Sequence, residues 1–353
     1  MRLLNALLVT CLISTGIFAC GTETTPDAVT GESNSNNTGG ENTNSSGTQE
    51  NNPAQSTLSF TCSTQGVVTE GKNSGWNVGG QDREFIAKLP NIDASTPVSV
   101  VFAWHGVGDN MNNFSSALPL YPDADSDFPF IAIYPQGLKL MPISTSPGAK
   151  QGMEWDIFEG ASQYENIEAL LFEEILGCLK QEYNIDGTRI YVMGFSGGAI
   201  VTNMLHSRYP QHIGAIYAMS GAWFNDENQT NDVNTGMFRV NFDWDDLNSS
   251  DHGAVILSHG GQNDWYGDAS YSTFIPPDGV IIDFENSAQY AVDFLPGKNR
   301  TVVDCSHQNG HAPHPQLGLN TVIDFFKVHQ AGKKSPYATD GLASGFPAAC
   351  SLR

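Results

Sequence analysis

The chain has 353 residues, of which 38 are acidic and 16 are basic, so that its formal net charge is −22. This charge argues against a nucleic acid or an anionic membrane surface as a partner, because both would repel the protein. The length is enough to bury one large hydrophobic core, and the sequence contains no internal repeat.

The chain begins with a segment that is typical of a signal peptide. Arg2 precedes an apolar run from Leu3 to Ala19, which is shorter than the roughly 20 residues that a membrane-spanning helix needs. The run ends in IFAC, which resembles the bacterial lipoprotein box, in which the cysteine is acylated and becomes the first mature residue. We therefore predict a lipoprotein signal peptide over residues 1–19 and lipidation of Cys20. The alternative is a plain secretory signal that is cleaved nearby.

The segment that follows consists almost entirely of Thr, Ser, Asn, Gly, Gln and Glu, without Lys or Arg. Such a composition cannot form a core. We predict a lipid-anchored low-complexity linker over residues 20–57 and one catalytic-sized domain over residues 58–353. The protein would be exported, and either lipid-anchored to the cell envelope or secreted, with a lipid anchor as its only contact with the membrane.

Once Cys11 is removed and Cys20 is lipidated, four cysteines remain for pairing, namely Cys62, Cys178, Cys305 and Cys350. An even number in an exported chain suggests disulfides, and four cysteines allow three pairings. The closeness of Cys305 and Cys350 in the last part of the chain favours their pairing, which leaves Cys62 with Cys178. Free buried thiols are the alternative.

Along the predicted domain, strand-like blocks alternate with helix-like blocks. The strand-like blocks are apolar at nearly every position, which is typical of strands covered on both faces; they are Val98–Trp104, Phe130–Pro135, Arg189–Phe195, Gly214–Ser220, Ala254–His259 and Arg300–Cys305. The helix-like blocks have apolar residues at spacings of three and four; they are Glu165–Tyr183, Gly198–Tyr209 and Gly318–Gln330. This alternation predicts an α/β fold with a mostly parallel central sheet and helices on both faces.

The pentapeptide GFSGG, residues 194–198, lies between an expected strand and an expected helix. This is the context that a Gly-x-Ser-x-Gly nucleophile elbow requires, because the sharp turn strains the serine backbone and leaves no room for side chains two residues away. Ser196 is therefore the candidate nucleophile, rather than only a small residue in a tight turn.

A serine hydroxyl needs a base and an acid that orients the base, in the chain order Ser, Asp, His. Asp264 follows the strand that ends at His259, and His311 follows the strand that ends at Cys305. Asp268, four residues beyond Asp264, is the competing acid, but it lies further from its strand.

Two further histidines, His307 and His314, flank His311 and raise the question of a zinc site. Gly310, Pro313 and Pro315 exclude the single helix face that a His-x-x-x-His pair would need. We therefore expect neither a metal nor a cofactor.

A serine nucleophile that attacks a carbonyl also needs donors for the negative oxygen of the tetrahedral intermediate. The backbone N–H of Gly197, after the nucleophile, is one candidate. The second is the N–H of Val107, in the segment HGVG after an early strand, where Gly106 allows a close approach. We expect His105 to be structural, bonded to the backbone of its loop.

Several segments together resemble the secreted bacterial esterases known as feruloyl esterases or polyhydroxybutyrate depolymerases, a branch of the α/β hydrolases. These segments are VFAWHGVGDN, RIYVMGFSGGA, HGGQND, CSHQNGHAPHP and GLASGFPAACSL, and the resemblance covers about Cys62 to Cys350. It implies the α/β-hydrolase fold, with Ser196 as nucleophile, Asp264 as acid and His311 as base. It also implies that Trp155 lines the substrate cleft. The acidic stretch Ala222–Asp251 is longer than a compact helical connection would need.

The sequence thus predicts an exported serine carboxylic ester hydrolase that acts on feruloyl or acetyl groups of plant-wall oligosaccharides. Trp265 and Trp155 are the candidate substrate-binding aromatics, and Trp223 and Tyr266 are further aromatics near the expected site. A polyester depolymerase and a surface binding protein without turnover are the alternatives, and a peptidase on the same fold is a third. The natural ester and the oligomeric state are not predicted.

Overall fold

The computed structural model describes residues 58–138, 141–142, 152–157, 165–225, 244, 246–248, 250–267 and 280–353. The expected signal peptide and linker lie outside the described residues, as do Asp268 and most of the acidic stretch between residues 222 and 251. The chain divides into two units, Met1–Asn51 and Asn52–Arg353, and every described residue belongs to the second.

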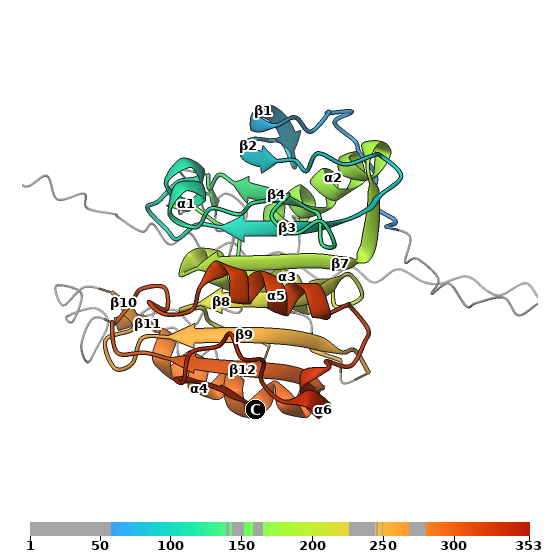
Figure 1. Cartoon of the computed structure of the whole chain (residues 1–353). Helices are drawn as coiled ribbons and strands as arrows, with labels where there is room; N and C mark the ends of the chain where they lie inside the picture. The colour runs from blue at the N-terminus through green and yellow to red at the C-terminus, as the bar shows by residue number, and fades with distance from the viewer. Residues whose placement is uncertain are drawn as a thin grey trace, which may run out of the picture. The chain divides into compact units, whose positions relative to one another are not determined.

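A twisted central sheet organises the second unit. Its strand order in the described part of the chain is β1-β2-β4-β3-β7-β8-β9-β12-β13 (Figure 1). The six central strands β4, β3, β7, β8, β9 and β12 are parallel to one another. The edge strands β1, β2 and β13 pair antiparallel with their neighbours. The strands of this sheet are β1 (Gly71–Val78), β2 (Gln81–Lys88), β3 (Pro97–Trp104), β4 (Phe130–Pro135), β7 (Asn184–Phe195), β8 (Ile213–Met219), β9 (Gly253–His259), β12 (Arg300–Ser306) and β13 (Cys350–Leu352).

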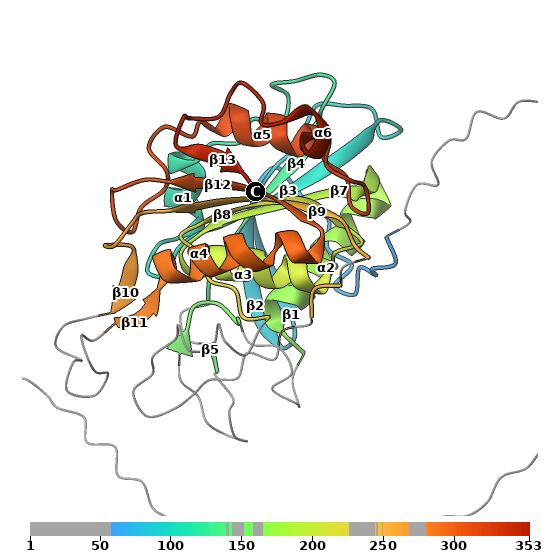
Figure 2. The same ribbon diagram turned by 90° about the horizontal axis from the view of Figure 1, so that it is seen from below.

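Helices cover both faces of the sheet. Figure 2 shows α2, α3 and α4 on one face, and α5 and α6 on the other. The helices are α1 (Met111–Ala117), α2 (Ile167–Glu182), α3 (Gly197–Arg208), α4 (Phe284–Phe294), α5 (Leu319–Val328) and α6 (Tyr337–Asp340), with a 3₁₀ turn, η3, at Pro296–Lys298. Two short antiparallel pairs complete the described elements: β5 (Met141–Pro142) with β6 (Gly152–Met153), and β10 (Trp265–Gly267) with β11 (Val280–Asp283).

The central strands are apolar because each packs against a hydrophobic core on both of its faces. In β3, Phe102 and Trp104 belong to the core under α2, α3 and α4, whereas Val101 and Ala103 belong to the core under α1, α5 and α6. Successive side chains of a strand point to opposite faces, so a strand buried on both sides needs apolar residues throughout. The expected α/β architecture, with a mostly parallel sheet between two helical layers, is confirmed.

The antiparallel edges of the sheet and the helices α1 and α4 were not anticipated from the sequence. In β1 the segment GKNSGWNV buries only Asn73, Trp76 and Val78, so it lacks the apolar run that marks the central strands. The strand β13 spans only Cys350–Leu352. Short or mostly polar edge strands give a weak hydrophobic signal.

Two disulfides join parts of the chain that are distant in sequence. Cys62 pairs with Cys178, and Cys305 pairs with Cys350, at sequence separations of 116 and 45. This is the pairing that the sequence favoured. The Cys62–Cys178 bridge links the first described residues of the domain to α2, where the Glu174 carboxylate also accepts hydrogen bonds from the backbone N–H groups of Ser63 and Thr64 at 3.1 and 2.7 Å.

Among the described residues, none of the helices has the length and apolar character needed to cross a membrane.

Candidate active site

Ser196 occupies a strained turn between β7 and α3. Its backbone has φ 55° and ψ −122°, and a positive φ is uncommon for a residue other than glycine. The flanking glycines are required by crowding: a Cβ atom on Gly194 would lie 2.2 Å from the carbonyl oxygen of Gly198, and one on Gly198 would lie 2.2 Å from that of Trp104. The geometry is that of the expected nucleophile elbow.

His311 and Asp264 converge on Ser196 from two loops. The Nε2 atom of His311 lies 2.9 Å from Oγ of Ser196, and its Nδ1 atom lies 2.7 Å from Oδ1 of Asp264. A carboxylate only accepts hydrogen bonds, so Nδ1 carries the ring proton and donates it to Asp264. The Nε2 atom is therefore free to accept the hydroxyl proton of Ser196.

Asp264, which lies between β9 and β10, is fully buried, and its second carboxylate oxygen is also bonded. Oδ2 accepts the hydroxyl of Ser220 and the backbone N–H of Gly260, both at 2.8 Å. The backbone carbonyl of Asp264 accepts the N–H of Phe284 at 2.9 Å. The carboxylate is thus held in one orientation from several sides. The competing acid, Asp268, lies outside the described residues.

The loop after β3 brings the backbone of Val107 close to Gly197 and Ser196. A Cβ atom built on Gly197 would lie 2.7 Å from Cγ2 of Val107 and 3.7 Å from its backbone nitrogen, and one built on Gly106 would lie 3.4 Å from Cβ of Ser196. Gly197 is the first residue of α3, where backbone N–H groups have no intrahelical partner and the helix dipole is positive. Gly197 and Val107 therefore lie together beside Ser196 at the N-terminus of α3.

His105 fixes that loop through its backbone contacts. Nδ1 donates to the carbonyl of Gly106 at 2.8 Å, and Nε2 accepts the N–H of Gly137 at 3.1 Å. Both bonds are satisfied by the neutral ring. Burial lowers the pKa of His105, although the hydrogen bond to Gly106 and the nearby Glu154 and Asp109 act in the opposite direction. The expectation of a structural histidine is confirmed.

Trp155 does not line an open cleft, which corrects the expectation from the resemblance. Its side chain is 0% exposed, packs edge-on against Trp104, and donates from Nε1 to the carbonyl of His105 at 3.0 Å. A Cβ atom on Gly197 would lie 3.2 Å from Cδ1 of Trp155. A buried aromatic ring has no free face for a substrate. Trp155 therefore supports the loop after β3 and the N-terminus of α3 instead.

The other expected aromatics separate into surface and core. Trp265 and Tyr266 follow Asp264 directly on β10 and are 37% and 50% exposed, whereas Trp223 is fully buried. Trp223 packs edge-on against His206 and Phe294 and belongs to the core.

Three contacts of this site were missed by the sequence reasoning: Ser220 on Asp264, and the rings of Phe195 and Phe284 on His311. Ser220 directly follows β8, and its φ of 51° is positive, like that of Ser196. Phe284 opens α4, a helix that was not anticipated. The only signal in the sequence was the position of Ser220 at the end of an expected strand.

His307 and His314 lie beside each other, with ring centroids 5.2 Å apart. The Nδ1 atom of His307 accepts the N–H of Asn309, and that of His314 accepts the N–H of Leu317 at 3.1 Å. In the part of the chain that the structure describes, the one group of three converging metal-type ligands is Cys62, Glu174 and Cys178, whose cysteines are joined in a disulfide.

Next to the Asp264 loop, a chain of charged groups is centred on the buried His259 and Asp304 and ends at the partly exposed Glu285 and Arg353. His259 hydrogen-bonds to Glu285 through Nδ1 at 2.5 Å and to Asp304 through Nε2 at 2.9 Å, and Asp304 pairs with Arg353 at 2.6 Å. Burial acts to lower the pKa of His259, but the hydrogen bonds to Asp304 and Glu285 outweigh it, so the pKa is raised. Glu285 also accepts the N–H of Gly261 at 2.9 Å, which links this chain to the acid loop.

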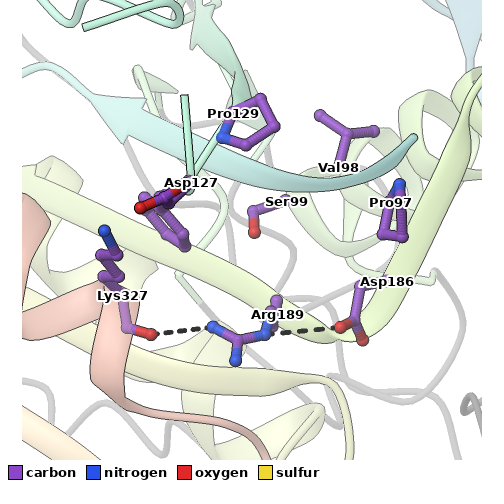
Figure 3. A pocket seen from close by; sticks show the side chains of 9 residues that line it. Pro97, Val98, Ser99, Asp127, Pro129, Asp186, Arg189 and Lys327 are labelled. Carbon is purple, nitrogen blue, oxygen red and sulfur yellow. Dashed lines mark hydrogen bonds and ion pairs between the residues drawn. The ribbon is translucent and has the colours of Figure 1, made fainter. Parts of the chain in front are cut away.

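A polar pocket of about 250 Å³ lies at the opposite, amino-terminal end of the strands (Figure 3). Arg189 of β7 contacts Asp186 at 3.4 Å and donates to the carbonyl of Lys327 at 2.8 Å, while the Lys327 ammonium pairs with Asp125 at 2.5 Å. Its cationic groups are therefore already paired within the protein, and it is separate from the Ser196 site.

Comparison with known proteins supports an esterase relationship. Residues 92–254 match the model of the phospholipase/carboxylesterase family of α/β hydrolases. The chain is similar to feruloyl esterase B of Neurospora crassa, with 26% identity over 168 residues, or 46% of this chain and 52% of that protein. It is also similar to acetylxylan esterase A of Aspergillus ficuum, with 28% identity over 153 residues, or 42% of this chain and 46% of that protein. The chain thus spans about half the length of these relatives.

Solved structures share the fold. The crystal structure of native sOPH aligns with a TM-score of 0.59 at 17% identity, covering 83% of this chain and 97% of that chain. Native pOPH aligns with a TM-score of 0.58 at 18% identity, covering 81% and 94%. The chain has the α/β-hydrolase fold, and its sequence is similar to that of carboxylesterase-type hydrolases.

Proposed function

We propose that this chain is a serine carboxylic ester hydrolase, with Ser196 as nucleophile, His311 as general base and Asp264 as the acid that orients the base. The observation that carries the proposal is the continuous chain of hydrogen bonds from Asp264 through His311 to Ser196, at 2.7 and 2.9 Å. The position of Ser196 at a strained strand-to-helix turn supports the same role.

In the first half of the reaction, Oγ of Ser196 attacks the ester carbonyl carbon while Nε2 of His311 takes the hydroxyl proton. The carbonyl oxygen becomes negative, and the N–H groups of Gly197 and Val107 donate to it. The buried carboxylate of Asp264 stabilises the imidazolium. Its hydrogen bonds to Ser220 and Gly260 hold it in place while the proton moves.

In the second half, the imidazolium returns its proton to the oxygen of the leaving alcohol, which departs and leaves Ser196 acylated. A water molecule then attacks the acyl carbon, with His311 as base, and the carboxylic acid is released as Ser196 regains its proton. This scheme uses side chains and backbone donors of the protein and requires neither a metal nor a cofactor.

The substrates that the site supports best are feruloyl or acetyl esters of plant-wall oligosaccharides. The relatives are named for feruloyl and acetylxylan esters. Trp265 and Tyr266, exposed immediately after Asp264, offer apolar ring surface for a phenolic or sugar group at the same end of the sheet as Ser196.

A side-by-side panel of methyl ferulate, acetylated xylo-oligosaccharide and polyhydroxybutyrate tests this substrate class. We expect the parent chain to release ferulate or acetate faster than hydroxybutyrate, and Trp265→Ala to raise KM for the preferred ester. Tyr121→Ala is the matched control, because Tyr121 is an exposed aromatic, at 64%, beside Lys88 in the loop after α1. Faster release of hydroxybutyrate would make the chain a polyester depolymerase, and binding of every ester without turnover would make it a binding protein.

We further propose that the protein is exported and anchored through a lipid on Cys20. The two disulfides support an oxidising compartment, where such bonds persist. Stable anchoring takes more than one acyl chain, since each buried CH₂ contributes only about 0.8 kcal/mol. The native protein should therefore partition with membranes, and a Cys20→Ala variant should remain in the soluble fraction. Equal release of both would refute the anchor.

A further inference from the structure

Two aromatic rings pack against the imidazole of His311. The ring of Phe284 lies 4.6 Å from it, centroid to centroid, with an interplanar angle of 14°, and the ring of Phe195 lies 4.9 Å away at 33°. We propose that Phe284, together with Phe195, is a positioning residue that holds the imidazole of His311 in its plane and stabilises the cation formed when that ring takes the proton of Ser196. This inference rests on the proposed function.

The ring of Phe284 is nearly parallel to the imidazole and therefore packs against one of its faces, and the ring of Phe195 packs against the imidazole at a tilt. The hydrogen-bonding edges of the imidazole meet Asp264 and Ser196. Rotation of the imidazole out of this plane would break both hydrogen bonds and would drive the ring into Phe195 or Phe284. The rings of Phe195 and Phe284 therefore favour the one orientation in which both nitrogens of His311 are hydrogen-bonded.

Phe284 is itself fixed, so that it links the base to the acid. Its side chain is 1% exposed, and its backbone N–H donates to the carbonyl oxygen of Asp264 at 2.9 Å. It is the first residue of α4, whose N-cap, Asp283, accepts the N–H of Asn286 at 2.9 Å. One residue thus touches Asp264 through its backbone and His311 through its ring, and a shift of α4 would move both together.

The face of an aromatic ring attracts a cation, by an amount equivalent to roughly a 2- to 30-fold change in an equilibrium constant. The imidazole is a cation only between proton transfer from Ser196 and proton return to the leaving group. The rings therefore favour the state that the reaction must pass through. Asp264 is the charged group that bonds to Nδ1 of His311, and His307, on the loop after β12, interacts electrostatically with Asp264, Glu285 of α4 and His259.

The test compares Phe284→Leu with Phe294→Leu in the full chain. The control makes the same change on the same helix, at a ring that packs against Trp223 and Tyr290. Leucine keeps an apolar side chain in place and removes the π face. We measure kcat and KM for p-nitrophenyl butyrate against pH, and we follow the low-field proton resonance of the Asp264–His311 hydrogen bond by NMR over the same range.

For Phe284→Leu we expect the acidic limb of the kcat/KM profile and the NMR midpoint to move to lower pH by about 0.4 to 1.5 units. We expect kcat to fall by about three- to tenfold, with KM changed less than twofold, because positioning acts on the chemical step. Phe284→Tyr, which restores a ring, should return the midpoint to that of the parent. Phe294→Leu should leave it unchanged.

An unchanged midpoint in Phe284→Leu, in a chain that folds normally by circular dichroism, overturns the inference. If that variant does not fold, Phe195→Leu, at the partly exposed second ring, must show the same shift, and no shift there also overturns it. A parent chain that hydrolyses no ester would refute the proposed function. The NMR midpoints of parent and variants would still decide whether the rings stabilise the charged imidazole.

Discussion

The Nε2 atom of His311 lies 2.9 Å from Oγ of Ser196, although 115 positions separate the two residues in the sequence. The parallel order of β7, β8, β9 and β12 explains this, because the carboxyl ends of parallel strands share one edge of the sheet. Ser196 follows β7, Ser220 follows β8, Asp264 follows β9 and His311 follows β12. Four neighbouring strands of the sheet are thus each followed by one residue of the site.

Ser220→Ala should lower kcat by about ten- to hundredfold, because a hydrogen bond to a charged group contributes roughly 1.5–3 kcal/mol. The hydroxyl of Ser220 donates to Oδ2 of Asp264 at 2.8 Å, and both side chains are fully buried. Ser220→Gly is the matched variant, since glycine accepts the positive φ of this position. Both variants should lose activity alike in steady-state assays. A loss in the alanine variant alone would assign the effect to backbone strain.

Trp155→Phe should lower kcat several-fold and leave KM nearly unchanged, because it removes the donor to the His105 carbonyl and keeps most of the ring volume. The loop that carries Val107 would then be held less firmly. Steady-state kinetics on p-nitrophenyl and feruloyl esters measures the split. An increase in KM that is specific to feruloyl esters, with kcat retained, would return Trp155 to the substrate cleft.

The charged chain around His259 should make stability depend on pH. The folded pKa of His259 lies above its usual value, so its contribution is complete below about pH 6.5 and is lost as pH rises through the folded pKa. For Asp304, burial acts to raise the pKa, but the bonds to His259 and Arg353 outweigh it, and the pKa is lowered. The Asp304 contribution is therefore present above the usual range of aspartate and is lost as pH falls through the lowered value.

Urea unfolding of the parent and of His259→Gln between pH 5.5 and pH 9 measures this dependence. The difference in the free energy of unfolding should be largest near the acidic end of that range and should shrink as pH rises. A difference that stays constant or grows with pH would show that folding does not raise the pKa of His259.

Removal of the Cys62–Cys178 disulfide by paired serine substitutions should lower the free energy of unfolding by about 2–5 kcal/mol. The bridge closes a loop with a separation of 116, against 45 for Cys305–Cys350, so its loss should cost about 1 kcal/mol more in the chain-entropy account. Denaturant unfolding of both pairs measures the order. A larger loss from the Cys305–Cys350 pair would mean that native contacts, rather than loop length, set the contribution.

The central strands were predictable because they are buried on both faces and therefore form continuous apolar runs, whereas the edge strands are not. The strained turn at Ser196 was predictable because the glycines around it record a backbone constraint at residues adjacent in sequence. Asp264 and His311 followed from the order in which this kind of site is assembled along the chain.

The supporting contacts were not predictable because they depend on which strands are neighbours. Ser220 and Asp264 are 44 positions apart, and nothing in the sequence near Ser220 distinguishes it from other strand-end serines. Trp155 was interpreted wrongly because an aromatic residue under a site and one that faces it have the same local sequence pattern. Only burial distinguishes the two cases, and the burial of Trp155 results from its packing against Trp104 and His105.

The most direct test of the account is hydrolysis of p-nitrophenyl butyrate by the full chain and by Ser196→Ala. We expect the parent to hydrolyse this ester without added metal and in the presence of a chelator. We expect the variant to lose activity by at least about a thousandfold, with an unchanged circular dichroism spectrum, because loss of a triad member removes the covalent route. Retention of parental activity in Ser196→Ala would contradict the assignment of Ser196 as nucleophile and, with it, the proposed mechanism.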